Sequence, residues 1–378
     1  MKNNIIVLCK PTHECNMNCE YCYDKKEKEM VKNKKMPLDI LEKSIQIVLK
    51  DFENITWIWH GGEATIMGKE FYENALKIFD KYKTEKHKIE FLMQSNGKNI
   101  KETKKWLKEL NIKPGYSYDI TNQNMHRDKI DLIKYLNEED GIISVVTEDN
   151  LDLVKYFKEH KKRNFISFNK LFFNNKNEKY DIKKYVDAYK KLFDFILYEK
   201  ECSIEKNILN MINSILNVKD VSCNFNQCLG EFININPDGF IFTCDRFGMK
   251  DMKYCLGNVN NYEHILECFS SEGFYNILKE DFEFRKNNCE KCEINMFCRN
   301  ICKANRVNEM NEIDVKENCF EECEFRREMI NYIFDILFNL SKEDLLKINL
   351  NVYQILFENK FIFKFILDDL KEEKIIDF

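Results

Sequence analysis

The distribution of cysteines constrains this chain more than any other feature of its sequence. The chain has 378 residues, of which 16 are cysteine. Four cysteines lie between Cys9 and Cys22, none between Cys22 and Cys202, and twelve between Cys202 and Cys323. In a secreted chain such a number would indicate disulfides, whereas in an intracellular chain it indicates metal sites. Because disulfides that stabilise a fold would not leave such a gap, the distribution favours metal centres in two separate regions.

The rest of the composition is that of an ordinary globular protein. Hydrophobic residues make up 44% of the chain, and 59 basic residues against 64 acidic ones give a net charge of −5. No basic block of the kind that binds nucleic acid is present. No apolar run is long enough to span a bilayer, and no charged-then-apolar leader opens the chain. We therefore expect a cytoplasmic protein with no nucleic-acid partner and no membrane partner.

Short apolar runs alternate with amphipathic segments as far as about Lys200, which is the pattern of parallel βα units. Strands are predicted at Ile5–Cys9, Thr56–Trp59, Ile89–Met93, Gly115–Tyr118, Ile142–Val146 and Phe165–Leu171. Helices are predicted near Leu38–Asp51, Glu70–Lys83, Ile100–Leu110, Lys129–Asn137, Asn150–His160 and Ile182–Lys200. Right-handed crossovers would curl these units into an α/β fold, a partial (β/α)6 TIM-like barrel. Such a barrel carries its functional groups on the loops that follow the strands.

The change in cysteine density divides the chain into three predicted regions. The barrel covers residues 1–205, a cysteine-rich domain covers 206–323, and a helical extension covers 324–378. The extension is predicted to contain helices at Met329–Leu340 and Val352–Leu367. Its dense Phe, Ile and Leu favour packing in a core, and a substrate or subunit surface is the alternative.

Three cysteines, Cys15, Cys19 and Cys22, follow the first predicted strand with the spacing C-x3-C-x2-C. Three thiolates in one tight loop can hold a [4Fe–4S] cluster and leave one iron without a protein ligand. Structural zinc sites use four protein ligands, so zinc is the less favoured alternative. With Tyr21 before the third cysteine, the loop resembles the signature of the radical S-adenosylmethionine (SAM) superfamily.

The resemblance implies that SAM binds the open iron through its amino and carboxylate groups, with Tyr21 beside the adenine. One electron from the reduced cluster would cleave SAM, and the resulting 5′-deoxyadenosyl radical would abstract a hydrogen from an unactivated C–H bond. The cofactor would carry this step while the protein orients it and excludes water. Such low-potential clusters imply an anaerobic host and a flavodoxin- or ferredoxin-type reductant.

The loops after the next strands carry further candidates for SAM binding. Gly61, Gly62 and Glu63 follow the second strand, and adjacent glycines permit a close backbone approach that a side chain would block. By themselves two glycines after a strand also make an ordinary turn. In the resembling family this segment binds the SAM amino group, and Glu63 would take part in that contact.

The resemblance extends to three further loops. The segment 94–97 is similar to the family's Q-T-N-G and makes Asn96 a cofactor candidate. Ser117 is a candidate for the SAM carboxylate, although Ile120 stands where many relatives have glycine. Arg127 is a second candidate for that carboxylate, with a surface salt bridge as the alternative, and Leu171 is predicted to cover the adenine.

In the second cysteine region, Cys228, Gly239 and Cys244 are followed by a C-x2-C-x5-C-x3-C run and then by Cys319. This spacing resembles the SPASM domain, a carrier of two auxiliary [4Fe–4S] clusters. The resemblance implies two ligand sets, Cys223, Cys228, Cys244 and Cys302 for the nearer cluster and Cys289, Cys292, Cys298 and Cys319 for the farther one. Two zinc ribbons are the alternative. Four thiolates on each cluster would leave no open iron, which favours electron transfer over substrate ligation as the role of these clusters.

Five cysteines fall outside these sets, namely Cys9, Cys202, Cys255, Cys268 and Cys323. They are predicted to be free and mostly buried thiols. Cys323 could replace Cys319 as a cluster ligand, but Cys319 keeps the family's interval better.

Asp245 immediately follows Cys244. In anaerobic sulfatase-maturating enzymes, which the chain resembles from end to end, a Cys-Asp at this point supplies the base that deprotonates a substrate Ser or Cys. A carboxylate beside an oxidised cluster could accept the proton as the cluster accepts the electron. A surface Asp in a loop is the alternative.

The resemblance implies an enzyme that modifies a residue of a peptide or protein by hydrogen abstraction and oxidation. The product is either a thioether or C–C crosslink in a ribosomally made peptide, as in RiPP maturases, or formylglycine in a sulfatase. Only eight residues precede Cys9, which disfavours a leader-binding domain. Arg246-Phe247 and the long segment after Cys323 depart from the sulfatase-maturating pattern, so crosslinking is slightly favoured. A small-molecule dehydrogenase and a non-enzymatic Fe–S or zinc scaffold are two less favoured functions.

Overall fold

The fold is built on one continuous sheet. The computed structural model describes residues 4–19, 21–31, 34–118, 132–147, 150–170, 181–218, 228–298, 300–310, 321–359 and 361. Within these residues the sheet has nine strands in the order β6-β5-β4-β3-β2-β1-β7-β8-β9. The first six strands in the chain lie side by side in sequence order, so the sheet grows outward from β1 in one direction and the later strands extend it in the other.

The first six strands form the predicted partial barrel. They are β1 (Asn4–Thr12), β2 (Asn54–Gly61), β3 (Lys88–Ser95), β4 (Lys113–Ser117), β5 (Gly141–Val146) and β6 (Ile166–Lys170). Each pairs with its neighbour in parallel. Every strand overlaps the range predicted for it, and the α/β fold class is confirmed. All working loops after these strands therefore open at one edge of the sheet.

Helices connect the strands and cover the sheet. They are α1 (Lys25–Met30), α2 (Leu38–Asp51), α3 (Gly68–Tyr82), α4 (Ile100–Glu109), α5 (Leu153–His160) and α6 (Ile182–Tyr198). The prediction of a helix at Lys129–Asn137 is wrong for the described residues 132–137, which hold only a short 3-10 turn at Ile133–Tyr135, while residues 129–131 lie outside the described part. Aromatic side chains fill the space between sheet and helices, as where the Trp57 and Phe79 ring centroids lie 5.0 Å apart.

The second cysteine region continues the sheet on the other side of β1. It begins with β7 (Phe232–Ile235), β8 (Phe240–Phe242) and β9 (Gly257–Asn258). β7 runs parallel to β1, while β8 and β9 add antiparallel strands. Gly239 has a φ of +82° in the turn between β7 and β8, which explains a glycine at this point of the cysteine pattern. The pairing fastens the second region to the first strand of the barrel.

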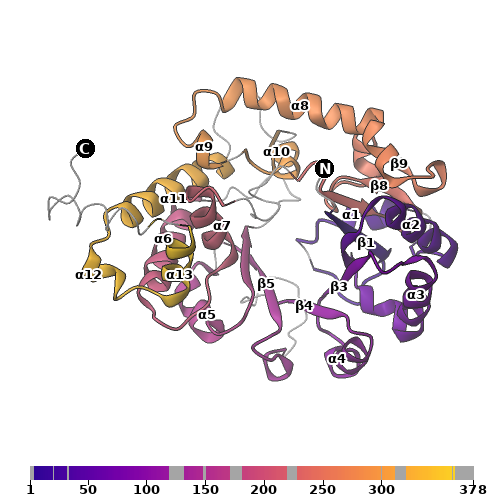
Figure 1. The fold of residues 1–378 in the computed structure, drawn as a ribbon, viewed down its shortest axis with the longest axis horizontal. Helices are drawn as coiled ribbons and strands as arrows, with labels where there is room; N and C mark the ends of the chain where they lie inside the picture. The colour runs from indigo at the N-terminus through magenta and orange to yellow at the C-terminus, as the bar shows by residue number, and fades with distance from the viewer. Residues whose placement is uncertain are drawn as a thin grey trace.

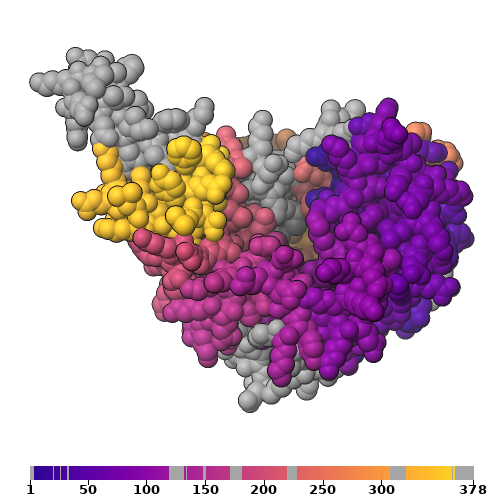
Figure 2. Space-filling view, turned by 60° about the horizontal axis from the view of Figure 1, so that its bottom comes forward, coloured from indigo at the N-terminus to yellow at the C-terminus, as the bar shows by residue number. Residues whose placement is uncertain are grey.

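The remaining helices complete the molecule. They are α7 (Lys206–Ile215), α8 (Glu272–Asn288), α9 (Asn295–Cys298), α10 (Lys303–Met310), α11 (Glu321–Phe338), α12 (Lys342–Leu345) and α13 (Leu350–Glu358). In Figure 1 α8 crosses above the sheet from the β8 and β9 side towards α9 and α11. Figure 2 shows the indigo N-terminal part and the yellow C-terminal helices on opposite sides of a hollow.

The C-terminal helices pack against α6 of the barrel. α11 lies along α6, where Tyr332 donates a hydrogen bond of 2.8 Å to Asp194 and the Tyr185 and Phe325 rings lie 4.8 Å apart. The predicted domain boundaries at 205 and 323 stay predictions, and α11 begins at Glu321, before the second boundary. In the described part of the chain, no helix is both long enough and apolar enough to cross a membrane.

Candidate active site

The predicted cysteine triad lies in the loop after β1. Cys15, Cys19 and Cys22 are all half-buried. The backbone N–H of Cys22 donates to the carbonyl of Cys19 at 3.3 Å, which makes the loop a tight turn. Burial raises the pKa of the Cys22 thiol, and the nearby Cys15 adds to the rise. Among the described residues, no three His, Cys, Asp or Glu side chains are grouped closely enough to hold a single metal ion.

The glycine segment after β2 packs directly on the start of the cysteine loop. The backbone N–H of Gly62 donates to the Thr12 carbonyl at 2.9 Å, and that of Glu63 donates to the Glu14 carbonyl at 2.8 Å. A Cβ added to Gly61 would lie 2.3 Å from the Thr12 carbonyl oxygen, and one added to Gly62 would lie 2.2 Å from that of Glu14. Only glycine permits this approach, so the two glycines hold the loop that carries the cysteines.

The Glu63 carboxylate is buried and is used within the protein. Its oxygens accept hydrogen bonds from Thr65, from the Ser95 hydroxyl at 2.9 Å and from the Asn96 backbone N–H at 2.7 Å. Glu63 therefore joins the ends of β2 and β3. The predicted contact with a SAM amino group is not tested by these hydrogen bonds, and it stays a prediction.

Asn96 and Ser117 also reach the edge where the cysteine loop lies. The Asn96 amide donates to the Asn16 side chain at 2.8 Å and lies 3.7 Å from the Cys15 sulfur. Ser117 accepts a hydrogen bond of 2.8 Å from the Gln94 amide. Tyr21 is half-buried within the cysteine loop. The other two predicted cofactor residues, Arg127 and Leu171, lie outside the described residues.

A buried ion cluster that the sequence did not predict lies beside this loop. Lys10, from β1, is almost fully buried and donates to the Asp24 carboxylate at 2.9 Å. His13 Nδ1 lies 3.1 Å from the other Asp24 oxygen. Burial would raise the pKa of Asp24, but Lys10 and His13 hold it well below its usual value. Asp24 is therefore an ionised carboxylate.

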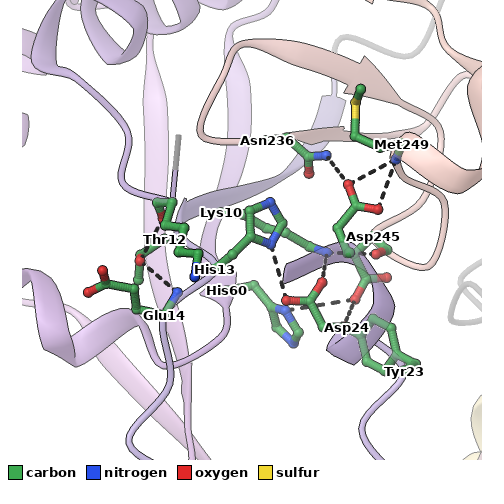
Figure 3. A network of polar contacts seen from close by, with 12 residues as sticks. Lys10, Thr12, His13, Glu14, Tyr23, Asp24, His60, Asn236, Asp245 and Met249 are labelled. Carbon is green, nitrogen blue, oxygen red and sulfur yellow. Dashed lines mark hydrogen bonds and ion pairs between the residues drawn. The ribbon is translucent and has the colours of Figure 1, made fainter. Parts of the chain in front are cut away.

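Asp245 meets this ion cluster from the second cysteine region. Figure 3 shows Asp245 with Lys10, Tyr23 and His60 around it. The Tyr23 hydroxyl donates to Oδ2 at 2.5 Å, Lys10 Nζ donates to the Asp245 backbone carbonyl at 2.8 Å, and His60 Nδ1 lies 3.7 Å from Oδ2. Burial would raise the pKa of Asp245, but His60, Lys10 and Tyr23 hold it below its usual value.

A second carboxylate fastens the chain just after Asp245. Glu27, on α1, is buried, and both of its oxygens lie 2.9 Å from the Met249 backbone N–H. A Cβ at Gly248 would lie 2.3 Å from Glu27 Oε2, so the segment approaches α1 as closely as glycine allows. The cysteine loop, α1 and the Asp245 segment thus form one packed unit. None of Lys10, Asp24 or Glu27 was predicted, because a charged residue in a single sequence gives no sign of being buried.

The auxiliary cysteines separate into two groups in space. Cys244 and Cys302 pack against one small core and influence each other electrostatically, while burial is the main cause of the raised pKa of Cys244. Cys289, Cys292 and Cys298 belong with a different, larger core. Cys302 thus packs against the same small core as Cys244, and the two ligand sets stay predictions. Cys228 is half-buried, and Cys223 and Cys319 lie outside the described residues.

The residues present fit the cofactors that the resemblance implies. The first loop offers three thiols and a side-chain amide beside one of them, which suits a cluster with three thiolate ligands. The second region offers further cysteines in two separate groups. A parallel partial barrel with such a loop after its first strand is the arrangement that the resemblance to radical SAM enzymes predicts, and the homologues of this chain support an enzyme of that class.

Comparison with known proteins identifies its homologues as anaerobic sulfatase-maturating enzymes. The chain is 28% identical over 375 residues to the cysteine-type anaerobic sulfatase-maturating enzyme of Clostridium perfringens, a match that covers 89% of this chain and 98% of that protein. It is similar to the solved structure of native anSMEcpe with bound AdoMet and Cp18Cys peptide, with a TM-score of 0.74, 26% identity and coverage of 89% and 98%. No family model matches the chain.

A second solved structure shares the fold alone. Streptococcus suis SuiB is similar with a TM-score of 0.54 and 17% identity, over 84% of this chain and 77% of that one. At this identity the likeness concerns the arrangement of strands and helices and not the chemistry.

Proposed function

We propose that this enzyme oxidises a Cys or Ser residue within a peptide or protein to formylglycine, with SAM and three [4Fe–4S] clusters as cofactors. The observation that most supports this is Asp245, which follows a predicted cluster ligand and is held by Tyr23 at 2.5 Å beside the cysteine loop. The likeness to a cysteine-type sulfatase-maturating enzyme over 98% of that protein's length supports the same reaction. A peptide bound to a similar structure supports a peptide as substrate.

The cofactors are assigned to the residues predicted for them. Cys15, Cys19 and Cys22 would hold the first cluster, and the glycine segment with Asn96 and Ser117 would bind SAM. When bound, these groups supply the radical that removes hydrogen and a path for electrons. The auxiliary sites would be held by the remaining predicted cysteines of residues 223–319, as the resemblance implies.

Asp245 has one oxygen directed at a cysteine and one held by a tyrosine. The Cys244 thiol donates to Oδ1 at 3.5 Å, while Tyr23 donates to Oδ2. A cysteine that ligates a metal is a thiolate without a proton to donate. Ligation at Cys244 would therefore leave Oδ1 without its donor, and that oxygen is the one we assign to the proton of the substrate thiol or hydroxyl.

The proposed conversion requires the loss of one hydrogen atom, one proton and one electron from the substrate residue. The hydrogen atom leaves the Cβ carbon to the radical, the proton leaves the side-chain S–H or O–H to Asp245, and the electron leaves to an oxidised acceptor. For Ser this gives the aldehyde directly. For Cys it gives a thioaldehyde, which water converts to the aldehyde with release of hydrogen sulfide.

The proposal is tested with Asp245→Asn and short peptides that contain a central Cys, Ser or Ala. The wild-type enzyme should give 5′-deoxyadenosine and a peptide aldehyde from Cys or Ser, detected with a hydrazide probe by mass spectrometry. Asp245→Asn should lower aldehyde formation by about 10²- to 10⁴-fold, the range for loss of a general base. Its cleavage of SAM should be retained.

The matched control for this test is Asp251→Asn, which removes a nearby carboxylate outside the site. Its aldehyde formation should equal that of the wild type. Equal aldehyde from Asp245→Asn would remove Asp245 as the base, and an absence of aldehyde from every peptide would remove formylglycine formation.

Peptide crosslinking is the second candidate function. It is supported by Arg246, which directly follows Asp245 at a position where sulfatase-maturating enzymes have the first residue of an aromatic pair. In this chain Arg246 donates a hydrogen bond to Asn305 of α10 instead. The same peptides discriminate the two products. A crosslinked peptide loses hydrogen, retains its sulfur and gives no hydrazide adduct.

A further inference from the structure

The group of cysteines around Cys298 includes Cys323, which the sequence spacing did not favour as a cluster ligand. We propose that Cys323, in the first turn of α11, supplies the fourth thiolate of the farther auxiliary cluster, with Cys289, Cys292 and Cys298. The assignment rests on the proposed function only in taking that cluster as present, and it is independent of the substrate. It departs from the family interval, which favours Cys319.

The four cysteines lie against the same core. Cys298 is buried in the large core formed with α6, α7 and α11, and Cys289, Cys292 and Cys323 pack against the same core. The electrostatic neighbours of Cys323 include Cys298 and Cys289, and those of Cys289 include Cys298 and Cys292. Four thiols from three separate segments thus lie beside one part of the core, too far apart for a single metal ion, whereas Cys302 belongs with Cys244.

Cys323 differs in this respect from other cysteines predicted to be free. Cys9 lies near Met36 and Trp57, Cys202 accepts a hydrogen bond of 3.1 Å from the Asn349 amide, and the electrostatic neighbour of Cys268 is Asp51. These three behave as small core residues. The surroundings of Cys323 differ because they contain two other thiols, those of Cys298 and Cys289.

Arg326 fixes Cys323 in this position. It lies three residues later on α11, so the two side chains share one face of the helix. The Arg326 guanidinium is fully buried and donates to the carbonyls of Cys298 at 3.3 Å and Asn300 at 2.8 Å. These contacts hold the start of α11 against the loop that contains Cys298.

The charge of Arg326 also suits an anionic cluster. A buried guanidinium requires compensating negative charge. Glu322 provides one carboxylate at 2.8 Å, and the Cys298 sulfur lies 3.9 Å from Nη1. Thiolate ligands at Cys298 and Cys323 would add to this compensation.

The first test measures which cysteine is protected in the intact enzyme. The anaerobically reconstituted protein is treated with iodoacetamide, the iron is removed with a chelator, and newly exposed thiols are labelled with a heavy iodoacetamide. Cys323 should carry the heavy label and Cys319 the light one. The opposite labels on these two residues would overturn the assignment.

The second test compares Cys323→Ala with Cys319→Ala, and Cys255→Ala is the matched control. Cys323→Ala should lower the iron content from about twelve to about eight per chain and remove one signal from the electron paramagnetic resonance (EPR) spectrum of the reduced protein. Cys319→Ala and Cys255→Ala should keep both the wild-type iron content and the full EPR spectrum. Loss of the signal from Cys319→Ala, with retention in Cys323→Ala, would overturn the proposal.

Two further readouts distinguish loss of a cluster ligand from misfolding and from failure of the proposed function. Cys323→Ser retains an oxygen ligand and should give a shifted EPR signal at unchanged helix content, measured by circular dichroism; an unshifted signal contradicts ligation. 5′-Deoxyadenosine formation should persist in all these variants, because Cys15, Cys19 and Cys22 are intact. A wild-type protein with about four iron per chain would contradict the auxiliary clusters themselves.

Discussion

Two buried carboxylates, Asp24 and Glu205, lie in different parts of the molecule and are stabilised in opposite ways. Asp24 accepts a hydrogen bond from Lys10 at 2.9 Å and lies 3.1 Å from His13. The hydrogen-bond donors to Glu205 are neutral amides, including the backbone N–H groups of Phe168 at 2.8 Å and Ile208 at 3.0 Å. The first carboxylate belongs to the candidate active site and the second to the junction of β6 with α7.

The pKa values of the two groups move in opposite directions. Burial opposes ionisation of both, but Lys10 and His13 hold the pKa of Asp24 well below its usual value. For Glu205 burial outweighs the amide donors and raises the pKa from 4.5 to about 7. The region around the first cysteine loop therefore keeps fixed charge by pairing it, whereas the core around α7 and α11 disfavours charge that lacks a cation.

The largest effect is expected from Lys10→Met, which removes the cation from the paired side of the comparison. Asp24 Oδ1 and the Asp245 carbonyl would lose Lys10 as their donor, and Asp24 would keep only its contact with His13. Breaking a buried ion pair from one side costs about 3–5 kcal/mol of unfolding free energy. The measurement is urea-induced unfolding at neutral pH, followed by circular dichroism.

The double variant Lys10→Met/Asp24→Asn is the control for this prediction. It removes the uncompensated charge as well as the cation, so it should recover part of the loss. Lys28→Met, which removes a lysine from the nearby α1, should have little effect. A double variant that loses the sum of both single effects would break the comparison, since Asp24 would then not depend on Lys10.

A smaller effect is expected from Glu205→Gln, which tests the unpaired side. A carboxyl with a raised folded pKa stabilises the protein fully below the unfolded value. This stability is lost as the pH rises from 4.5 to about 7, because the unfolded chain ionises first. The unfolding free energy of the wild type should fall by about 3 kcal/mol relative to that of Glu205→Gln over this range.

The readout for Glu205 is the slope of the unfolding free energy against pH. The hydrogen bonds that Gln loses lower this free energy equally at every pH and leave the slope unchanged. Glu199→Gln, which removes a half-exposed carboxylate paired with Lys161, is the matched control and should keep the wild-type slope. Parallel curves for wild type and Glu205→Gln would show that amide donors alone keep this carboxylate ionised, and the contrast with Asp24 would disappear.

The barrel could be predicted from the sequence because its signals are local. Each strand is a short apolar run of the kind seen at Ile142–Val146, which lies within β5 (Gly141–Val146), and crossover helices such as α2 and α6 have their own periodic pattern. The pairing of β1 with β7 was not predicted. It joins Ile6 to Phe232, and a contact so distant in sequence leaves no local pattern in either strand.

The candidate site was predictable where the chemistry requires a spacing. The C-x3-C-x2-C loop and the two glycines at the end of β2, Gly61 and the following Gly62, could be identified, and the resemblance indicated Asp245. Lys10, Tyr23 and His60 were missed, because their role depends on what lies beside them after folding. The lysine at the end of the apolar run Ile5–Cys9 was the one available signal, since a charge that continues a buried strand needs a partner.

The smallest effect is expected from His60→Gln, which tests whether His60 belongs to the group of paired charges around Asp24 and Asp245. Burial lowers the pKa of His60, although Asp245 opposes this, so His60 is neutral near pH 7, and its Nδ1 lies 3.7 Å from Asp245, beyond hydrogen-bond distance. Its loss should therefore cost less than the roughly 1 kcal/mol of a hydrogen bond, which is less than about a fivefold fall in aldehyde formation. SAM cleavage should be unchanged, and the ratio of His60→Gln to wild-type rates should stay constant between about pH 7 and pH 9, where His60 does not titrate. A fall as large as that of Asp245→Asn would mean that His60 takes part in the proton transfer itself, and the charged region would then extend from Asp24 through Asp245 to the end of β2.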